Sequence, residues 1–317
     1  MTSTPSLVIA AACSLLLCAC GPPAAAGADD PAQASQGERA GSYDRPDTVD
    51  VGSWNVEWFG EPERGPQDER AQLANVAEVL GTVDLDLVGL VEVVSGDAFA
   101  ELLAALPGYQ GVLVTDDGVA GGADEYGEGE QKVALLVRDR FTVTAARVVL
   151  ADQAWVFAGR PPLEVSLAFS ERGRPRTLDV VVVHLKAMAD ADGYQRRTQA
   201  AAALRAWLEA VHAHDWALVI GDFNDDLDAS TWQGRTSPFD ALAHDPRYRF
   251  TTAALTDAGI STTVWHGATI DHHLATTSLA RRFVEGSAEV LRPDAWIADY
   301  DESTSDHFPV LTRYHLR

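Results

Sequence analysis

The sequence predicts an α/β fold in which two β-sheets pack face to face and helices cover their outer faces. Apolar runs with the length and alternation of strands recur through residues 47–317, whereas amphipathic helical patterns are few and far apart. The content of 46% hydrophobic and 22% charged residues is ordinary for a globular protein. No internal repeat or second linker divides this stretch, so we expect one layered domain.

The first third of this domain is predicted to alternate strands with helices. Alternating apolar residues indicate a strand over 49–58, and apolar residues recur at helical spacing over 73–80. A continuous apolar run over 86–93 is typical of a buried strand, and 97–106 has a helical pattern. Residues 115–131 are rich in glycine and acidic residues, which predicts a loop.

The remainder is predicted to be mostly strands, with one further amphipathic helix over 200–211. β-branched and aliphatic residues dominate the strand-like runs, as half-buried or buried strands require. These runs lie at 132–138, 141–150, 163–169, 176–184, 216–221, 270–276 and 308–312.

The chain is strongly acidic, with 24 Lys+Arg against 47 Asp+Glu and a formal charge of −23. This balance excludes a basic groove that binds nucleic acid by charge alone. It does not exclude a phosphate substrate, because salt screens exposed charges beyond about 8 Å and a bound metal reverses the local sign. The cysteines are Cys13, Cys18 and Cys20, so residues beyond 20 contain no disulfide, thiolate zinc site or cysteine nucleophile.

The N-terminus has the pattern of an export signal. The apolar run 7–19 is too short to span a bilayer as a helix, and 17–21 resembles a bacterial lipoprotein box. We therefore predict a lipoprotein-type signal peptide over 1–20, lipidation of Cys20, and an extracytoplasmic protein that is membrane-anchored or secreted. A plain signal peptide cleaved nearby is the alternative. Residues 21–46 have few large apolar side chains, which predicts a disordered linker.

Polar side chains are found where the predicted strands end. Taken singly, each has a structural explanation, such as an Asx turn or a paired charge. Together they form an unusual set of carboxylates, amides and imidazoles for unrelated strand ends: Asn55, Glu57, Glu92, His184, Asp222, Asn224, Asp271, Asp306 and His307.

This set fits metal-assisted attack of water on a phosphate ester. Oxygen ligands such as Glu92, Asn55 and Asp306 suit Mg²⁺, with Mn²⁺ as a substitute. A carboxylate is needed to orient the water, and an imidazolium can meet the charge that develops on the phosphate oxygens. Zinc is less favoured, because no His-x-x-x-His pair lies on a helix and His212 and His214 fall on opposite sides of one.

Six motifs resemble, in order, those of the endonuclease/exonuclease/phosphatase superfamily, which includes DNases, abasic-site endonucleases, inositol polyphosphate 5-phosphatases and sphingomyelinases. The resemblance covers residues 50–313 and implies a four-layer α/β/β/α sandwich of two mixed sheets with the site at one end. Gly159-Arg160-Pro161-Pro162-Leu163 and the Arg-Arg-x-Gln sequence at 196–199 also resemble this family. The six motifs are Ser53–Gly60, Gly89–Val93, Val183–Lys186, Gly221–Asp225, Ile270–His272 and Ser305–Val310.

The resemblance also implies a metal site. Glu92 matches the principal metal carboxylate of the family. Asn55 and Glu57 match residues of the first strand that surround the metal, and Asp306 also lies near it.

Catalytic roles follow from the same resemblance. Asp222 matches the residue that orients or deprotonates the attacking water, and Asn224 matches its phosphate-contacting partner. His307 matches the histidine bonded to the scissile phosphate, and Asp271 the residue that supports a histidine. His184 matches a second histidine found in the DNase-like branch.

Three functions remain open at this point. A nuclease-type phosphodiesterase is the first hypothesis, because of His184 and the Asn55-Val56-Glu57 sequence. A phosphoinositide or sphingomyelin-type lipid phosphoesterase is the alternative within the same enzyme class, and a non-catalytic surface lipoprotein is the alternative outside it. The expected partners are a phosphate-ester substrate such as nucleic acid, and a membrane through the lipid anchor. We expect a monomer.

Overall fold

The computed structural model describes residues 47–265 and 267–316. The predicted signal peptide, the lipidation of Cys20 and the linker over 21–46 therefore lie outside the described residues. Within the described part, no helix is both long enough and apolar enough to cross a membrane.

The first sheet has six strands in the order β11-β12-β1-β2-β4-β3. β1 and β2 run parallel, and the other neighbours are antiparallel, so the sheet is mixed. The parallel pair brings the carboxyl ends of both strands to one edge. The strands are β1 (Thr48–Phe59), β2 (Leu87–Val93), β3 (Tyr109–Leu113), β4 (Lys132–Arg138), β11 (Glu289–Val290) and β12 (Val310–His315).

The second sheet also has six strands, in the order β5-β6-β7-β8-β10-β9. Here β7 and β8 are the parallel pair, and the remaining neighbours are antiparallel. The strands are β5 (Thr142–Val148), β6 (Leu163–Glu171), β7 (Arg174–His184), β8 (Ala217–Asp222), β9 (Tyr248–Phe250) and β10 (Asp271–Thr276).

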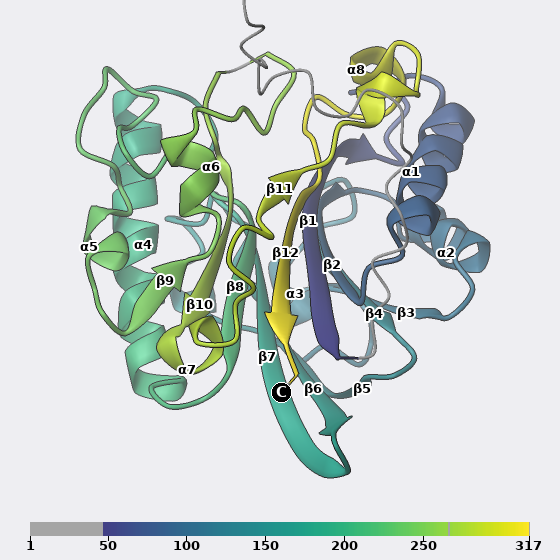
Figure 1. Ribbon diagram of the computed structural model, residues 1–317. Coiled ribbons are helices and arrows are strands. Elements are labelled where there is room, and N and C mark those ends of the chain that lie inside the picture. Colours follow the sequence, from purple (N-terminus) through teal and green to yellow (C-terminus); the bar gives the residue numbers. More distant parts are fainter. Residues whose placement is uncertain (1–46, 266, 317) are drawn as a thin grey trace, which may run out of the picture. The chain divides into compact units, whose positions relative to one another are not determined.

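Helices cover the outer face of each sheet, which confirms the predicted α/β/β/α order of layers (Figure 1). α1 (Glu69–Val83) and α2 (Gly96–Ala105) pack on the first sheet, and α4 (Ala191–Val211) packs on the second. The shorter helices are α3 (Gly122–Glu125), α5 (Asp240–Ala243), α6 (Ala253–Asp257), α7 (Thr277–Ala280) and α8 (Tyr300–Ser303), with 3₁₀ turns at Ala151–Gln153 and Pro293–Ala295.

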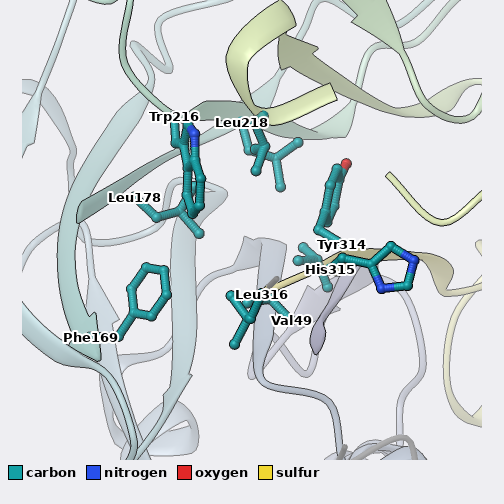
Figure 2. A pocket seen from close by; sticks show the side chains of 10 residues that line it. Val49, Phe169, Leu178, Trp216, Leu218, Tyr314, His315 and Leu316 are labelled. Carbon is teal, nitrogen blue, oxygen red and sulfur yellow. The ribbon is translucent and has the colours of Figure 1, made fainter. Parts of the chain in front are cut away.

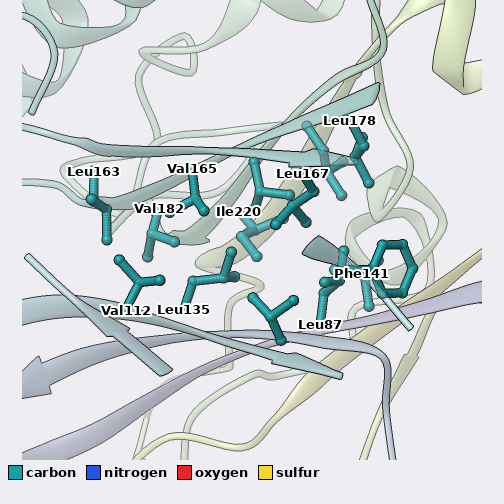
Figure 3. Packing of buried hydrophobic residues seen from close by; sticks show 14 of the residues in the cluster. Leu87, Val112, Leu135, Phe141, Leu163, Val165, Leu167, Leu178, Val182 and Ile220 are labelled. Carbon is teal, nitrogen blue, oxygen red and sulfur yellow. The ribbon is translucent and has the colours of Figure 1, made fainter. Parts of the chain in front are cut away.

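The central core lies between the two sheets (Figure 3). Leu87 and Leu135 from the first sheet meet Val165, Val182 and Ile220 from the second, and each is completely buried. Burying one such side chain contributes about 1.5–3 kcal/mol. This packing fixes the two sheets against each other, so the carboxyl ends of both parallel pairs are held at a common end.

The structure contains elements and boundaries that the sequence did not predict, among them the short strands β9 and β11 and the short helices α5 to α8. β3 was not predicted, because only its last two residues are buried and its alternation is weak. α4 begins at Ala191, well before the predicted residue 200, because its first turns are mostly polar and contribute little apolar periodicity. The loop predicted over 115–131 contains the single-turn helix α3.

Candidate active site

The ends of β1 and β2 form the first wall of the candidate active site. The pairing of β1 with β2 is regular as far as Asn55 and then shifts register before Phe59. Around this bulge Glu57 and Glu92 have φ angles of 45° and 67°, a left-handed backbone that is uncommon for residues other than glycine. Such strain is typical of functional sites, where it aims side chains that a regular strand would leave on alternating faces.

Asn55 links the two sheets at this wall. Its Nδ2 donates to Glu92 Oε1 at 2.9 Å and to Asp222 Oδ2 at 3.2 Å, while its Oδ1 accepts from the backbone N–H of Glu57 at 3.0 Å. The other Glu92 oxygen accepts from the backbone N–H of Trp58 at 3.1 Å. These bonds hold the Glu92 carboxylate in one orientation next to Asp222.

The second wall is a row of side chains across three adjacent strands. His184 at the end of β7 pairs with Asp222 at the end of β8, and Asp222 in turn pairs with Asp271 at the start of β10. His184 Nε2 lies 3.5 Å from Asp222 Oδ2 and 3.6 Å from Glu92 Oε1. All three residues of the row are at most 2% exposed, so their interactions are little screened by water.

The residues on either side of Asp222 fix the conformation of its backbone and the orientation of its side chain. A Cβ at Gly221 would lie 2.1 Å from the carbonyl oxygen of Val183, and Gly221 has a φ of 133°. Asn224, with a φ of 57°, donates its backbone N–H to Asp222 Oδ1 at 2.8 Å and its Nδ2 to the carbonyl of Leu185 at 3.2 Å. The turn therefore holds one Asp222 oxygen and leaves the other facing the histidines.

His307 completes the group from the loop before β12. Its Nδ1 lies 2.9 Å from Asp271 Oδ2 in a hydrogen bond, and its Nε2 lies 3.8 Å from Asp222 Oδ2 and 3.9 Å from Asp306 Oδ1. The carbonyl oxygen of His307 accepts from Trp54 Nε1 at 3.0 Å and from the Tyr300 hydroxyl at 2.6 Å. Both the ring and the backbone of this residue are thus fixed.

The two histidines of the site differ in the direction of their pKa shifts. Burial lowers the pKa of His184 well below 6.5, and the positive charges of Arg160 and His307 lower it further. Burial also opposes the charged form of His307, but Asp271 and Asp222 outweigh it and raise the pKa well above 6.5. Near pH 7 the site therefore holds a neutral His184 and an imidazolium at His307.

Glu57, Glu92 and Asp306 supply carboxylates, which are the type of group that binds a divalent cation. Glu57 Oε2 accepts from the backbone N–H of Asp306 at 2.9 Å. Burial, followed by the negative charge of Asp306, raises the pKa of Glu57 to about 7, and burial also raises the pKa of Glu92. A cation among these oxygens would relieve both effects, and carboxylates are the ligands that Mg²⁺ and Mn²⁺ prefer. Nearby, ligand atoms of Asp222, Asp271 and His307 lie within 4.8 Å of one another.

A comparison with protein families identifies the family of this chain. The model of the Endonuclease/Exonuclease/phosphatase family matches residues 52–307. The chain belongs to this family. Its members hydrolyse phosphoester bonds with the help of a divalent metal, so the chain is a phosphoester hydrolase. No curated protein matches the chain.

Solved structures with the same fold include three from this family. An endonuclease/exonuclease/phosphatase from Bacteroides vulgatus is 19% identical with a TM-score of 0.60, over 85% of this chain and 99% of that one. TDP2 of D. rerio, complexed with single strand DNA product, is 14% identical with a TM-score of 0.60, over 84% and 99%. The 3′ phosphatase NExo from Neisseria, bound to product DNA hairpin, is 15% identical with a TM-score of 0.57, over 84% and 99%. These likenesses show the shared fold.

All the predicted site residues of the enzyme lie together at this end. Three aromatic residues in the chain near the predicted motifs, Trp58, Phe59 and Trp265, differ in their surroundings. Phe59 is 1% exposed and belongs to the core. Arg64 stacks on Trp58, 4.4 Å from the ring centroid. Trp265 is 69% exposed. Of these three side chains, Trp265 is the most exposed.

Arg160 is a site residue that the sequence analysis did not select, although it lies in a stretch that resembles the family. Its side chain donates to the carbonyl of Leu185 at 3.0 Å and to Gln131 Oε1. Burial lowers its pKa, and the carboxylates of Glu92 and Asp222 act against this fall. A buried guanidinium beside two carboxylates is a candidate for contact with phosphate oxygens.

Two cavities were compared as possible substrate-binding sites. The apolar pocket in Figure 2, lined by Val49, Trp216 and Tyr314 among others, holds about 10 Å³, enough for one water molecule. It contains no acid–base pair, so it is not a candidate active site. A wider hollow of about 500 Å³ is lined by residues that follow β1 and β2, including Gly60, Val94 and Ser95. None of the candidate site carboxylates is among its lining residues.

Proposed function

We propose that the enzyme is a Mg²⁺-dependent phosphodiesterase that hydrolyses nucleic acid by attack of water on phosphorus. One observation carries the proposal. The buried Asp222 carboxylate lies between the neutral His184 and the His307 imidazolium, at 3.5 and 3.8 Å, and shares Asn55 with the metal-type carboxylate Glu92. A candidate base (Asp222), a cationic group (His307) and a carboxylate of the type that binds Mg²⁺ (Glu92) are therefore close together.

Glu92, Glu57 and Asp306 are the proposed metal ligands, with Asn55 fixing Glu92 beside them. When bound, the metal neutralises charge on the phosphate oxygens and activates water. The proposed ligands contribute by holding their carboxylate oxygens in a fixed arrangement. The left-handed backbone at Glu57 and Glu92 achieves this before substrate arrives, so no reorganisation is needed at the moment of reaction.

Asp222 is the proposed base. Burial raises its pKa to about 7 although His307 lowers it, so the carboxylate can accept a proton near neutral pH. The backbone N–H of Asn224 holds Oδ1. Oδ2 accepts from Asn55 Nδ2 and faces the two histidines, and it is the oxygen proposed to receive the proton from water. His307, held through Nδ1 by Asp271, presents its Nε2–H to a non-bridging phosphate oxygen.

His184 and Asn224 are the proposed neutral contacts. The neutral ring of His184 can donate one hydrogen bond through Nε2, which faces Glu92 and Asp222. Asn224 follows Asp222 by two residues and offers its side-chain amide, whose Nδ2 also donates to the carbonyl of Leu185 at 3.2 Å. Neutral donors orient a phosphate without adding a second full positive charge that would also bind the product tightly.

The preference for nucleic acid rests on His184, which resembles the DNase-like branch, and on similar folds that bind DNA products. TDP2 of D. rerio is complexed with single strand DNA product, and NExo from Neisseria with a product DNA hairpin. The net charge of −23 favours low affinity and a steep loss of binding as salt is added. A lipid phosphoesterase remains the competing function.

The test is hydrolysis by the purified full chain of single-stranded DNA, duplex DNA, RNA and phosphoinositide or sphingomyelin vesicles. We expect cleavage of nucleic acid in Mg²⁺ and none in EDTA. Asp222→Asn should abolish it, whereas Asp228→Asn, an exposed carboxylate in the same loop, should retain it. Hydrolysis of the lipids with none of the nucleic acids would replace the proposed substrate, and full activity in EDTA would exclude the mechanism. No hydrolysis of any substrate would favour a binding scaffold.

A further inference from the structure

A second cluster of histidine and carboxylates lies at the other end of the β7–β8 pair. Asp179 in β7 pairs with Ala217, the first residue of β8, whereas His184 and Asp222 pair at the carboxyl ends. The five residue-to-residue steps from Asp179 to His184 correspond to roughly 17 Å of strand. His212 caps the end of α4, and Asp215 lies in the turn that leads into β8. The cluster is therefore separate from the active site.

The ring of His212 is aimed at two carboxylates. Its Nδ1 lies 3.6 Å from Asp179 Oδ2 and 3.5 Å from Asp215 Oδ2, and ligand atoms of the three residues lie within 4.8 Å of one another. The His212 side chain is only 5% exposed. Its Nδ1 is buried and has no hydrogen-bond partner. A buried nitrogen without a partner costs free energy unless something else binds it.

The contacts of the ring leave Nδ1 as the nitrogen available to a metal. Burial lowers the pKa of His212, but Glu164, Asp179 and Asp215 outweigh it and raise the pKa, so a bound ion would displace a proton from Nδ1. His212 Nε2 lies 2.7 Å from Glu164 Oε1, so the ring donates its N–H there, and Arg147 pairs with the other Glu164 oxygen. Asp179 Oδ1 accepts from the Ser166 hydroxyl at 2.6 Å, which leaves Oδ2 facing the ring. A carboxylate that holds the far nitrogen of a metal-binding histidine is a common arrangement in metal sites.

We propose that Asp179, His212 and Asp215 bind a divalent transition-metal ion of the Zn²⁺ type. Metal–ligand distances of about 2.0–2.2 Å place neighbouring atoms of a tetrahedral site roughly 3.3–3.6 Å apart, which is the spacing around Nδ1. The imidazole ligand favours Zn²⁺ over Mg²⁺. Asp215 is 57% exposed, so the ion has a path from solvent and a fourth position for water.

The proposed ion would cross-link three segments of the chain. It joins the end of α4 to the middle of β7 and to the turn before β8. That turn is otherwise held through the carbonyl oxygen of Asp215, which accepts from the Thr276 hydroxyl at 2.8 Å. An ion that binds only the folded state raises its stability.

The test compares three full-length proteins for the number of Zn²⁺ ions bound at equilibrium and for the Tm with and without Zn²⁺. Asp215→Asn removes one charged ligand with an exposed side chain, so it should fold. Asp240→Asn is the matched control, because Asp240 is 53% exposed and lies 3.2 Å from His244. Cys13, Cys18 and Cys20 are present in all three proteins, so any zinc they hold cancels in the comparison.

We expect the wild type and Asp240→Asn to bind one more Zn²⁺ than Asp215→Asn, or to bind it at least about tenfold more tightly. The rise in Tm with Zn²⁺ should be reduced in Asp215→Asn alone. Mg²⁺ at the same concentration should leave the Tm difference between the proteins unchanged. Equal stoichiometry and equal Tm shifts in all three proteins would overturn the proposal and leave a protonated His212 among the carboxylates.

Discussion

The two ends of the β7–β8 pair each place a histidine among carboxylates, but they do so by different means. At the carboxyl ends both ring nitrogens of His307 face carboxylates, and Asp222 and Asp271 are each 1% exposed. At the amino ends both ring nitrogens of His212 also face carboxylates, Nε2 that of Glu164 and Nδ1 those of Asp179 and Asp215, but the Asp215 side chain is 57% exposed.

The backbone shows the same contrast. Glu57, Glu92 and Asn224 at the catalytic end have positive φ angles, whereas none of Asp179, His212 and Asp215 does. The catalytic end therefore stores strain to fix side chains that a regular strand would separate. The amino end uses ordinary strand and cap positions, as a site that needs binding without catalysis would.

We expect the largest effect on activity from removing the proposed base, Asp222, or the imidazolium, His307, at the catalytic end. Asp222→Asn and His307→Ala should each lower kcat by two or more decades, because acid–base catalysis contributes about 10²–10⁴-fold and transition-state electrostatics about 10²–10³-fold. Their effects should not add, since both serve one transition state. Kinetics of the single and double variants, with circular dichroism as a check on folding, test this. A change in Tm with near-normal kcat would assign Asp222 to turn closure alone.

Backbone strain at the catalytic end is tested by Gly221→Ala. The new Cβ would meet the carbonyl oxygen of Val183 at 2.1 Å, so the free energy of unfolding should fall by at least about 2 kcal/mol, and activity should fall with it. Gly234→Ala is the control, because its φ is 62° but nothing lies within 4 Å of the added carbon. It should cost about 1 kcal/mol. Equal losses in denaturant unfolding would contradict the close-approach argument.

The metal at the catalytic end is tested by Glu92→Gln. This variant keeps the size of the side chain but removes a charge, so the Mg²⁺ concentration needed for half-maximal activity should rise at least about tenfold. Asp215→Asn, at the other end of the strands, should leave that concentration unchanged. An unaltered Mg²⁺ requirement in Glu92→Gln would remove Glu92 from the metal site.

His273 is another buried histidine, and its hydrogen-bond partners are hydroxyl groups and not carboxylates. His273 contacts the hydroxyls of Thr312 at 2.6 Å and Ser53 at 3.0 Å, and burial lowers its pKa from 6.5 to about 3. The unfolded chain therefore binds a proton first as pH falls, so the stability due to the neutral ring is present above pH 6.5 and is lost toward pH 3.

Unfolding experiments at pH 6 and pH 5 measure this effect. His273→Gln should reduce the loss of stability between these two pH values by about 1 kcal/mol, since one pKa unit corresponds to about 1.4 kcal/mol. His244→Gln, at a side chain that is 78% exposed, should leave the loss unchanged. Identical pH dependence in wild type and His273→Gln would show that the ring does not titrate as described.

Most of the strands, the main helices and the identity of the polar residues at the strand ends could be predicted from the sequence, but the short strands β3, β9 and β11 could not. Strand periodicity and apolar runs are local properties, so 86–93 and 216–221 were recognisable without any tertiary contact. Carboxylates, amides and histidines at several strand ends indicated metal-assisted hydrolysis, because parallel strands that share an orientation bring their ends together.

Tertiary structure alone decided the protonation of the two histidines and the part played by residues without a local signal. His184 and His307 have the same side chain, and only their neighbours separate a neutral ring from an imidazolium. Arg160 reaches the site from the loop between β5 and β6, and Asp179 meets His212 only when β7 packs beneath the end of α4. Such pairings depend on distances between residues far apart in the chain, and those distances are set by the packing of the two sheets and their helices.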